Sequence, residues 1–213
     1  MKNSYVEYKW EKVETCAHNY IIPAIIKIIR KLNIPSTANI LDVGSGGGNL
    51  LWTLYNKLDL KNVYGFDASV SAIELAKKNF PALAKNFFIH NAYESKLPSD
   101  VPKEYDLIIS MEVIEHLYDP KTYLENIYMW LKRNGFLIIT TPYHGYFKNL
   151  ALSIFNAWDR HFTATWVGGH IKFFSKKTLS LMLKNTGFEI VSFYGCGRIL
   201  FLWKTMIIVA RKV

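Results

Sequence analysis

A cluster of glycines in the first quarter of the chain limits the folds that this sequence can adopt. Residues 39–43 form a short, mainly apolar run, four of the next five residues are glycine, and residues 49–58 then place apolar side chains at helical spacing. This order predicts a strand, a glycine-rich loop and a helix. Because glycine has no Cβ, the backbone N–H groups at the start of such a helix can face a ligand closely. The loop therefore predicts a ligand site, and a tight turn without a ligand is the alternative.

The rest of the chain continues the alternation of strands and helices. We expect further strands over residues 62–66, 86–90, 105–110, 135–141, 188–194 and 205–211, and helices over 20–32, 69–79, 121–132 and 175–185. Strands that alternate with helices of this length predict a parallel sheet covered on both faces. The predicted fold class is α/β, of the Rossmann-like, doubly wound type.

The spacing within the glycine loop narrows the ligand. A dinucleotide-binding loop follows the pattern G-x-G-x-x-G, and this chain has Asn49 where the third glycine would stand. The loop also lacks the lysine that follows the glycines of a nucleoside triphosphate-binding P-loop. Asp67 closes the second expected strand, where a carboxylate can accept hydrogen bonds from two ribose hydroxyls. The ligand is therefore expected to contain a nucleoside. For Asp67 alone, a helix-capping role is the alternative.

Composition sets the other limits. The 26 lysines and arginines against 17 acidic residues give a net charge of +9, which favours anionic partners, but the basic residues are scattered, which favours a soluble basic surface over a nucleic-acid site. Cys16 and Cys196 are too few for a disulfide framework, so we expect a reduced, cytoplasmic protein. Neither a signal peptide nor a membrane span is expected. Peripheral contact with a membrane stays open.

Three segments resemble class I S-adenosylmethionine-dependent methyltransferases. Residues 40–48 resemble the first motif of that family, residues 65–67 its ribose-binding acid, and residues 105–112 its fourth strand. Within the family, residues 112–120 and 169–174 are most similar to the ubiquinone-pathway O-methyltransferases, and more distantly to enzymes that methylate the terminal ribose of small RNAs. The resemblance covers about residues 38–142.

The resemblance implies both a topology and a cofactor site. The implied seven-stranded sheet is mostly parallel, with the order 3-2-1-4-5-7-6 and the last strand antiparallel. The implied cofactor is S-adenosylmethionine. Its implied contacts are Gly44, Ser45, Gly46, Asp67, Ala68, Asn91, Ala92 and Met111. The family often has an acid where this chain has Asn91, so a charged hydrogen bond to adenine would become a neutral one.

Acidic residues and a histidine follow the fourth expected strand. Glu112, Glu115 and His116 are spaced i, i+3, i+4, which predicts one helical face at the carboxyl end of the sheet. The alternative is a helix N-terminus that favours acids, with His116 packed on the next loop. In the families named above a later histidine joins the corresponding acids, and His170 matches it. Two carboxylates and two imidazoles suit Mg²⁺, Mn²⁺ or Zn²⁺.

Without a metal ion, His116 or His144 is the candidate general base. His144 follows the fifth expected strand, and a loop histidine without a catalytic role is the alternative. His18 and Tyr20 either close over the amino-acid end of the cofactor or have a structural role in the first helix.

We expect one methyltransferase domain over residues 1–213. Its parts are an N-terminal helical cap (1–35), a cofactor-binding core (36–142), an aromatic insertion or lid (143–174), and a C-terminal helix with strands (175–213). The insertion is longer than most connections, and such segments are usually lids or binding loops. Trp158, Phe162 and Trp166 either wall an apolar acceptor or pack on one another.

The predicted activity is O-methylation of a hydroxylated small molecule of quinol, phenolic, polyketide or sugar type. One rival is ribose 2′-O-methylation of RNA, which the net charge favours and the scattered basic residues disfavour. The other rival is a cofactor-binding subunit without turnover. Neither the acceptor nor the oligomeric state follows from the sequence.

Overall fold

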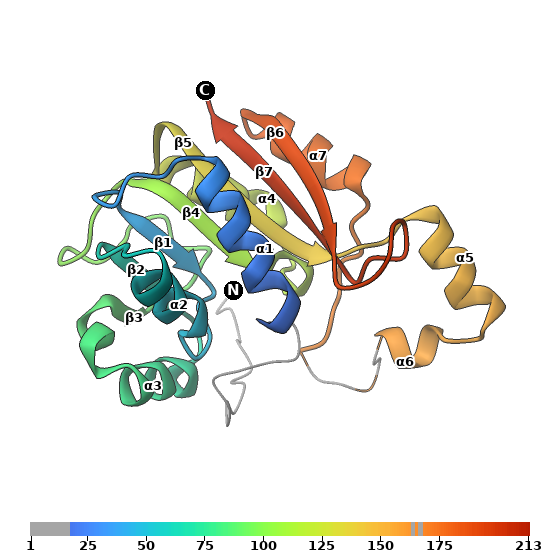
Figure 1. Ribbon diagram of the computed structural model, residues 1–213, viewed down its shortest axis with the longest axis horizontal. Coiled ribbons are helices and arrows are strands. Elements are labelled where there is room, and N and C mark those ends of the chain that lie inside the picture. The colour runs from blue at the N-terminus through green and yellow to red at the C-terminus, as the bar shows by residue number, and fades with distance from the viewer. Residues whose placement is uncertain (1–17, 163–164, 166–167) are drawn as a thin grey trace.

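The computed structural model describes residues 18–162, 165 and 168–213 of the chain (Figure 1). The helices are α1 His18–Lys31, α2 Asn49–Lys57, α3 Val70–Asn79, α4 Pro120–Trp130, α5 Tyr146–Ile154, α6 Trp158–Phe162 and α7 Lys176–Asn185, with two 3₁₀ helices, η1 Pro81–Asn86 and η2 Ile114–His116. The strands are β1 Ile40–Val43, β2 Val63–Asp67, β3 Phe87–Ile89, β4 Tyr105–Met111, β5 Leu131–Pro142, β6 Phe188–Cys196 and β7 Thr205–Lys212.

The seven strands form one sheet in the order β3-β2-β1-β4-β5-β7-β6. β1 to β5 pair in parallel, and β7 is antiparallel to both of its neighbours. The predicted strand order and the antiparallel last strand are therefore confirmed. Pro142 at the end of β5 lies opposite Thr205 at the start of β7, so the loop between β6 and β7 reaches the same edge of the sheet as the carboxyl ends of the parallel strands.

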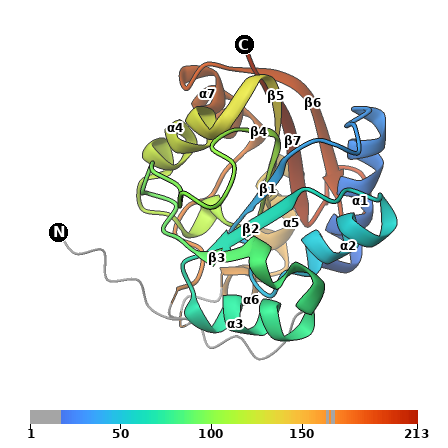
Figure 2. The ribbon, with the colours of Figure 1, turned by 90° about the vertical axis from the view of Figure 1, so that its left-hand side faces the viewer.

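Helices cover both faces of the sheet, and the strands supply apolar side chains to both. On β7, Ile207 and Val209 face the cluster built with α1, α2 and α3, whereas Ile208 and Ala210 face the cluster built with α4 and α7. Successive side chains of a strand point to opposite faces. This explains why the strands read as continuous apolar runs. Figure 2 shows α4 and α7 on one side of the sheet and α1 and α2 on the other.

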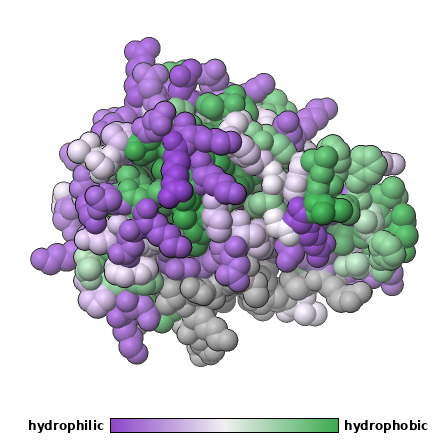
Figure 3. Space-filling view, viewed as in Figure 1, coloured by the Kyte–Doolittle hydropathy of each residue, from purple (hydrophilic) through white to green (hydrophobic). Residues whose placement is uncertain are grey.

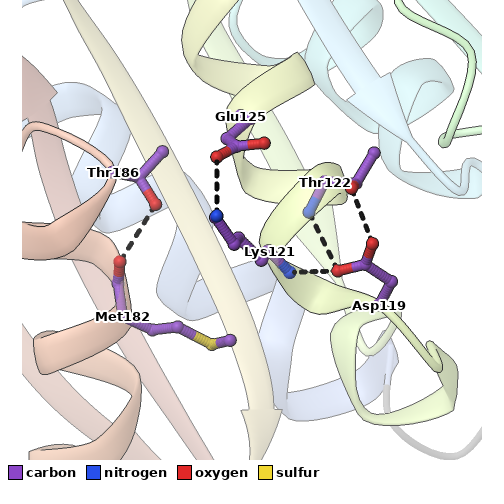
Figure 4. A network of polar contacts seen from close by, with 6 residues as sticks. All are labelled: Asp119, Lys121, Thr122, Glu125, Met182 and Thr186. Atoms are coloured by element: carbon purple, nitrogen blue, oxygen red, sulfur yellow. Dashed lines mark hydrogen bonds and ion pairs between the residues drawn. The ribbon is translucent and has the colours of Figure 1, made fainter.

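Polar caps fix where helices begin. Ser69 accepts a hydrogen bond from the Ala72 N–H at 3.1 Å and caps α3, as expected. Asp119 caps α4 by accepting from the N–H groups of Lys121 and Thr122, both at 3.1 Å, and from the Thr122 hydroxyl at 2.6 Å (Figure 4). These bonds satisfy amides that have no partner within the helix. Helix α4 ends two residues earlier than expected, because β5 already begins at Leu131.

The expected aromatic insertion contains two helices that the sequence reasoning did not predict. α5 and α6 follow β5 and project beyond the carboxyl edge of the sheet (Figure 1). Gly145 precedes α5 without a side-chain cap, so the start of this helix carries a weak sequence signal. Trp166 and the whole part of the N-terminal cap before His18, including Cys16, lie outside the described residues. In the part of the chain that is described, no helix has the length and hydropathy needed to cross a membrane.

Helix α5 and the loop after β6 together expose an apolar surface. Its members are exposed aromatic and aliphatic side chains: Tyr146, Phe147, Leu150, Ile154, Phe155, Ile199, Leu200 and Phe201. The rings of Phe147 and Phe201 are 5.8 Å apart, which joins the helix to the loop. Figure 3 shows hydrophobic side chains gathered on this side of the molecule. We call this set the α5 apolar face.

Candidate active site

The site lies at the carboxyl edge of the sheet, where open α/β sheets bind their ligands. β1 ends there at the glycine loop, β2 at Asp67, β4 at Met111 and β5 at Pro142. Parallel strands bring these ends to one edge although up to about 100 residues separate them in sequence. The fold therefore assembles most of the residues that the sequence reasoning selected.

The glycine loop adopts backbone conformations that favour glycine. Gly44, Gly46 and Gly48 have φ angles of 77°, 51° and 83°. A Cβ at Gly44 would lie 2.4 Å from Cγ2 of Val113, and one at Gly48 would lie 2.6 Å from Cζ of Phe87. Both the left-handed backbone and the close neighbours exclude larger side chains at Gly44 and Gly48. These glycines are thus required by the fold as well as by any ligand.

Asp67 is held in a fixed orientation beside this loop. Its Oδ2 accepts a hydrogen bond from the Gly46 N–H, and its Oδ1 accepts one from the Ser69 N–H, both at 2.9 Å. The Gly46 amide thus joins the loop to the acid, whereas the sequence reasoning had it face the ligand. Ser69 is the N-cap of helix α3, and Asp67 accepts the N–H of this capping residue, so Asp67 also supports the start of α3.

The other predicted cofactor contacts lie close to the ends of neighbouring strands. Ala68 directly follows β2, and Met111 ends β4. Both are half-buried, as are Asn91 and Ala92. Asn91 and Ala92 follow β3, where the Asn91 Oδ1 accepts from the Tyr93 N–H at 3.0 Å and the Ala92 carbonyl accepts from the Asn126 side chain at 2.9 Å. Their contacts with adenine stay a prediction.

Asp42 is a site residue that the sequence reasoning missed. It lies on β1 with 1% exposure, and its Oδ1 has no hydrogen-bond partner among the described residues. Burial, and then the charge of Asp67, raise the pKa of Asp42 to about 8. A lone acid within the apolar run of residues 40–43 was the available signal, because a buried strand rarely contains one without a functional reason.

The predicted helical face of Glu112, Glu115 and His116 is wrong. Glu112 has a φ of 56° and precedes a 3₁₀ helix of only three residues, so the three side chains do not share the face of an α-helix. Glu112 turns toward β5 and β7 instead. Its Oε1 accepts from the Thr140 hydroxyl at 2.7 Å and its Oε2 from the Thr205 hydroxyl at 3.5 Å. Burial raises the pKa of Glu112 to about 7, although these hydroxyls and Lys148 oppose the shift.

Three of the four predicted metal ligands do come together. Ligand atoms of Glu115, His116 and His170 all lie within 4.8 Å of one another, and the two imidazole rings are 4.8 Å apart. The Glu115 carbonyl accepts from the N–H groups of Ile171 and Lys172, both at 2.9 Å, which fixes the segment after His170 against η2. Glu112 is not part of this cluster. Sequence spacing alone could not reveal the cluster, because 54 residues separate His116 from His170.

The chemistry of this cluster suits a cation. Glu115 is 1% exposed, and neither carboxylate oxygen has a hydrogen-bond partner in the described structure. Burial, and then Glu112, raise the pKa of Glu115 well above its usual range. His116 donates its Nδ1 proton to the Gly168 carbonyl at 2.8 Å, so Nε2 carries the lone pair. Burial lowers the pKa of His116 and brings that of His170 to about 4, so both rings are neutral at pH 7.

Two further histidines and several aromatic rings line the adjacent wall. His144 lies 5.3 Å from the ring of His161 and 5.3 Å from that of Phe173. Phe162 stacks on Trp158 at 4.8 Å and contacts Phe173 at 4.4 Å. Burial brings the pKa of both His144 and His161 to about 4. The aromatic residues therefore pack on one another, and in doing so they form an apolar wall that contains neutral imidazoles.

The first helix contacts the same edge. The His18 ring and the Asn49 amide are 3.1 Å apart, directly beside the glycine loop. Tyr20 lies 3.5 Å from the Thr205 hydroxyl, which in turn donates to Glu112. Both residues thus have structural contacts, and a role over the cofactor stays a prediction.

Known proteins with similar sequences show the family to which this chain belongs. Residues 17–193 match the family described as "Methyltransferase domain". A mitochondrial ubiquinone biosynthesis O-methyltransferase from Schizosaccharomyces pombe is 35% identical over 119 residues, which are 54% of this chain and 42% of that protein. A ubiquinone biosynthesis O-methyltransferase from Rickettsia bellii is 30% identical over 186 residues, which are 83% of this chain and 71% of that protein. The chain thus spans less than half the length of the yeast relative.

A solved structure shares the fold. Magnesium protoporphyrin IX methyltransferase from Synechocystis PCC 6803, with bound S-adenosylhomocysteine, superposes with a TM-score of 0.67 at 16% identity. The match covers 91% of this chain and 82% of that one. At this identity the likeness concerns the fold.

Proposed function

Because the chain belongs to the methyltransferase domain family, as a member of the class I S-adenosylmethionine-dependent methyltransferases, we propose that it O-methylates a hydroxylated small molecule. The observation that carries the choice of oxygen chemistry is the cluster of Glu115, His116 and His170 at the edge where the cofactor loop lies. Its relatives named as O-methyltransferases support this choice. The quinol class of acceptor follows from those names and is part of the proposal.

We place the cofactor across the glycine loop and Asp67. Asp67 would bind the ribose hydroxyls, and Gly44, Ser45 and Gly46 would border the amino-acid end. Ala68, Asn91 and Ala92 would border the adenine, and Met111 would be a further contact of the cofactor. The sulfonium already activates the methyl group, so the protein contributes mainly orientation and exclusion of water. The packed rings of Phe162 and Phe173 would contribute to this exclusion once an acceptor covers them.

A divalent cation fits the cluster described above. Glu115, His116 and His170 would hold it, and the bond from His116 Nδ1 to a backbone carbonyl is the orientation that metal-binding imidazoles usually have. When bound, such an ion supplies Lewis acidity that lowers the pKa of an acceptor hydroxyl. Glu112, which was also predicted to be a ligand, instead accepts hydrogen bonds from Thr140 and Thr205.

Without a bound cation, the neutral imidazole of His116 or His144 can act as the proton acceptor, whereas a cation on Nε2 of His116 would leave this role to His144. His144 is 9% exposed, and its lowered pKa leaves the ring unprotonated at pH 7. A base must reach the proton that it takes, which favours the histidine nearest the acceptor hydroxyl. His116 or His144 has this role in our proposal.

The two rival functions make different predictions. An RNA ribose methyltransferase would lose binding steeply with added salt, because phosphate contacts release counterions. A non-catalytic subunit would bind S-adenosylmethionine and transfer nothing. The burial of the polar groups of the site, among them Glu115, His144 and Lys148, favours a small-molecule acceptor over RNA.

Radiolabelled methyl transfer to catechols, hydroxylated polyketides, sugars and RNA tests this proposal. We expect label on a catechol or phenol oxygen, and no transfer to any hydroxylated acceptor would contradict it. Elemental analysis and titration with a chelator test the cation separately. Full activity of metal-free protein would refute the metal site and leave a histidine base.

We further propose that the α5 apolar face rests on an anionic lipid bilayer, where an apolar acceptor would reside. The positive charge of this part of the chain suits an anionic partner, and the exposed aromatic and aliphatic side chains favour a bilayer over an acidic protein with a polar surface. After Glu125 the chain holds two acidic residues, Asp159 and Glu189, against twelve basic ones. Exposed aromatic residues bordered by cations suit the interface of an anionic membrane.

A further inference from the structure

Helix α5 has an inverted arrangement of side chains. Its aromatic residues Tyr146 and Phe147 are 75% and 57% exposed, whereas Lys148 is 5% exposed and is the only residue of the helix that is buried. Lysine is almost never fully buried unless it is paired, because removing its charge from water is costly. The arrangement therefore calls for an anion on the inner side of α5.

The described structure provides no close partner for this lysine. Its Nζ donates to the Lys204 carbonyl at 3.4 Å, near the upper limit for a hydrogen bond, although an ammonium has three protons to donate. Within the described residues, no carboxylate lies within 4.0 Å of Nζ. Glu112 attracts the ammonium from a greater distance, but its oxygens already accept from Thr140 and Thr205.

The surroundings of Lys148 are positive or neutral. Burial, and then the positive charge of Arg198, lower the pKa of Lys148 to about 8, so the amine is still mostly protonated at pH 7. The rings of His144, His161 and His170 all lie near enough for the ammonium to lower their pKa values further, and they are neutral. Glu112 is the acid whose charge acts on Lys148, and Glu115 lies beside His170. The local charge is therefore suited to an anionic ligand.

We propose that Lys148 binds an oxyanion, a carboxylate or a phosphate, carried by the acceptor next to its reacting hydroxyl. This inference rests on the proposed function and narrows its substrate class. The aromatic wall beside His144 would hold the apolar body of the acceptor, and the ammonium would hold its charged group, which orients the hydroxyl toward the His116 and His170 side. Lys148 is thus a specificity-determining residue that would discriminate acidic acceptors from neutral ones.

Calorimetric titration of the full chain, saturated with S-adenosylhomocysteine, tests this inference. The probes are dihydroxybenzoate, the isosteric dihydroxybenzamide, and phenyl phosphate against phenol. We expect each anionic probe to bind about tenfold more tightly than its neutral counterpart, since a charge-assisted hydrogen bond discriminates by at least this factor. The two pairs distinguish a carboxylate from a phosphate. Equal affinities within both pairs, or no binding of either anion, would overturn the inference.

Lys148→Met, which keeps the apolar stem and removes the charge, should abolish this preference, and Lys148→Arg should retain part of it. Lys57→Met, which changes an exposed lysine on α2, is the matched control and should leave the preference intact. Thermal unfolding separates a structural role: if Lys148 only anchors α5, Lys148→Met lowers the melting temperature and keeps the preference, which would also overturn the inference. Each sample is also tested for binding of S-adenosylhomocysteine. Wild-type protein that binds S-adenosylhomocysteine but shows no preference for anions contradicts the role of Lys148 alone, whereas absence of this binding in wild type contradicts the proposed function.

Discussion

Replacing Gly44 by alanine should destabilise the protein in two separable ways. The φ of 77° is a left-handed conformation that costs a residue with a Cβ about 1–2 kcal/mol. The added Cβ would lie 2.4 Å from Val113 Cγ2, far inside the ~3.5–4.0 Å of an ordinary carbon contact. Relief of such overpacking typically costs about 1–3 kcal/mol. We therefore expect Gly44→Ala to lower the free energy of unfolding by about 2–5 kcal/mol.

A double-mutant cycle isolates the steric part. Val113→Ala removes the methyl group that the new Cβ would meet, so Gly44→Ala should cost about 1–3 kcal/mol less in that background. Gly48→Ala is the control, because its Cβ would meet Phe87 instead, and its cost should add to that of Val113→Ala within about 0.5 kcal/mol. Urea unfolding of the wild type, the three single variants and the two double variants gives these energies. Additivity of Gly44→Ala with Val113→Ala would refute the steric reasoning.

Three further predictions concern the cofactor, the buried acid and the apolar face. Asp67→Asn should weaken S-adenosylhomocysteine about tenfold or more by calorimetry, because a charge-assisted bond becomes neutral, whereas Asp119→Asn, at the exposed cap of α4, should not. The pKa of Asp42 is about 8 in the folded state against 3.8 in the unfolded state, so ionisation of Asp42 opposes folding as the pH rises from 4 to 8. The stability of Asp42→Asn relative to wild type should therefore increase over this pH range. A difference in urea unfolding that does not change with pH would contradict the raised pKa of Asp42. Phe147→Ser should reduce co-sedimentation with phosphatidylglycerol vesicles severalfold, whereas Leu181→Ser, at an equally exposed position on α7, should not. Equal binding of the vesicles by both variants would contradict docking through the α5 apolar face, and capture of a protein partner without vesicle binding would exclude the bilayer.

The fold was predictable because its signals are local. Strand 39–43, the glycine loop and helix 49–58 each carry a pattern within a few residues, and β7 reads as apolar because both of its faces are buried. Helix α5 was missed since its apolar residues face outward and its lysine inward, against the usual pattern of a surface helix.

The site was only partly predictable, for a different physical reason. Asp67 and the glycines are placed by strand ends, which sequence patterns reveal. The arrangement of Glu112 depends on a left-handed backbone at one residue and on hydroxyls from β5 and β7, which no spacing rule contains. The meeting of His116 with His170 depends on two backbone bonds to the Glu115 carbonyl. Long-range contacts of this kind appear only in three dimensions.

Single-turnover methyl transfer by His170→Asn tests the central claim most directly, namely that the acceptor reacts beside the cluster of Glu115, His116 and His170. The measurement uses labelled S-adenosylmethionine and the best acceptor of the screen. Wild type and His90→Asn serve for comparison, because His90 is a buried histidine whose ring contacts the Glu94 carbonyl. We expect His170→Asn to transfer the methyl group about a hundredfold more slowly, with unchanged affinity for S-adenosylhomocysteine. Transfer at the wild-type rate by His170→Asn would contradict the proposed location of the chemistry.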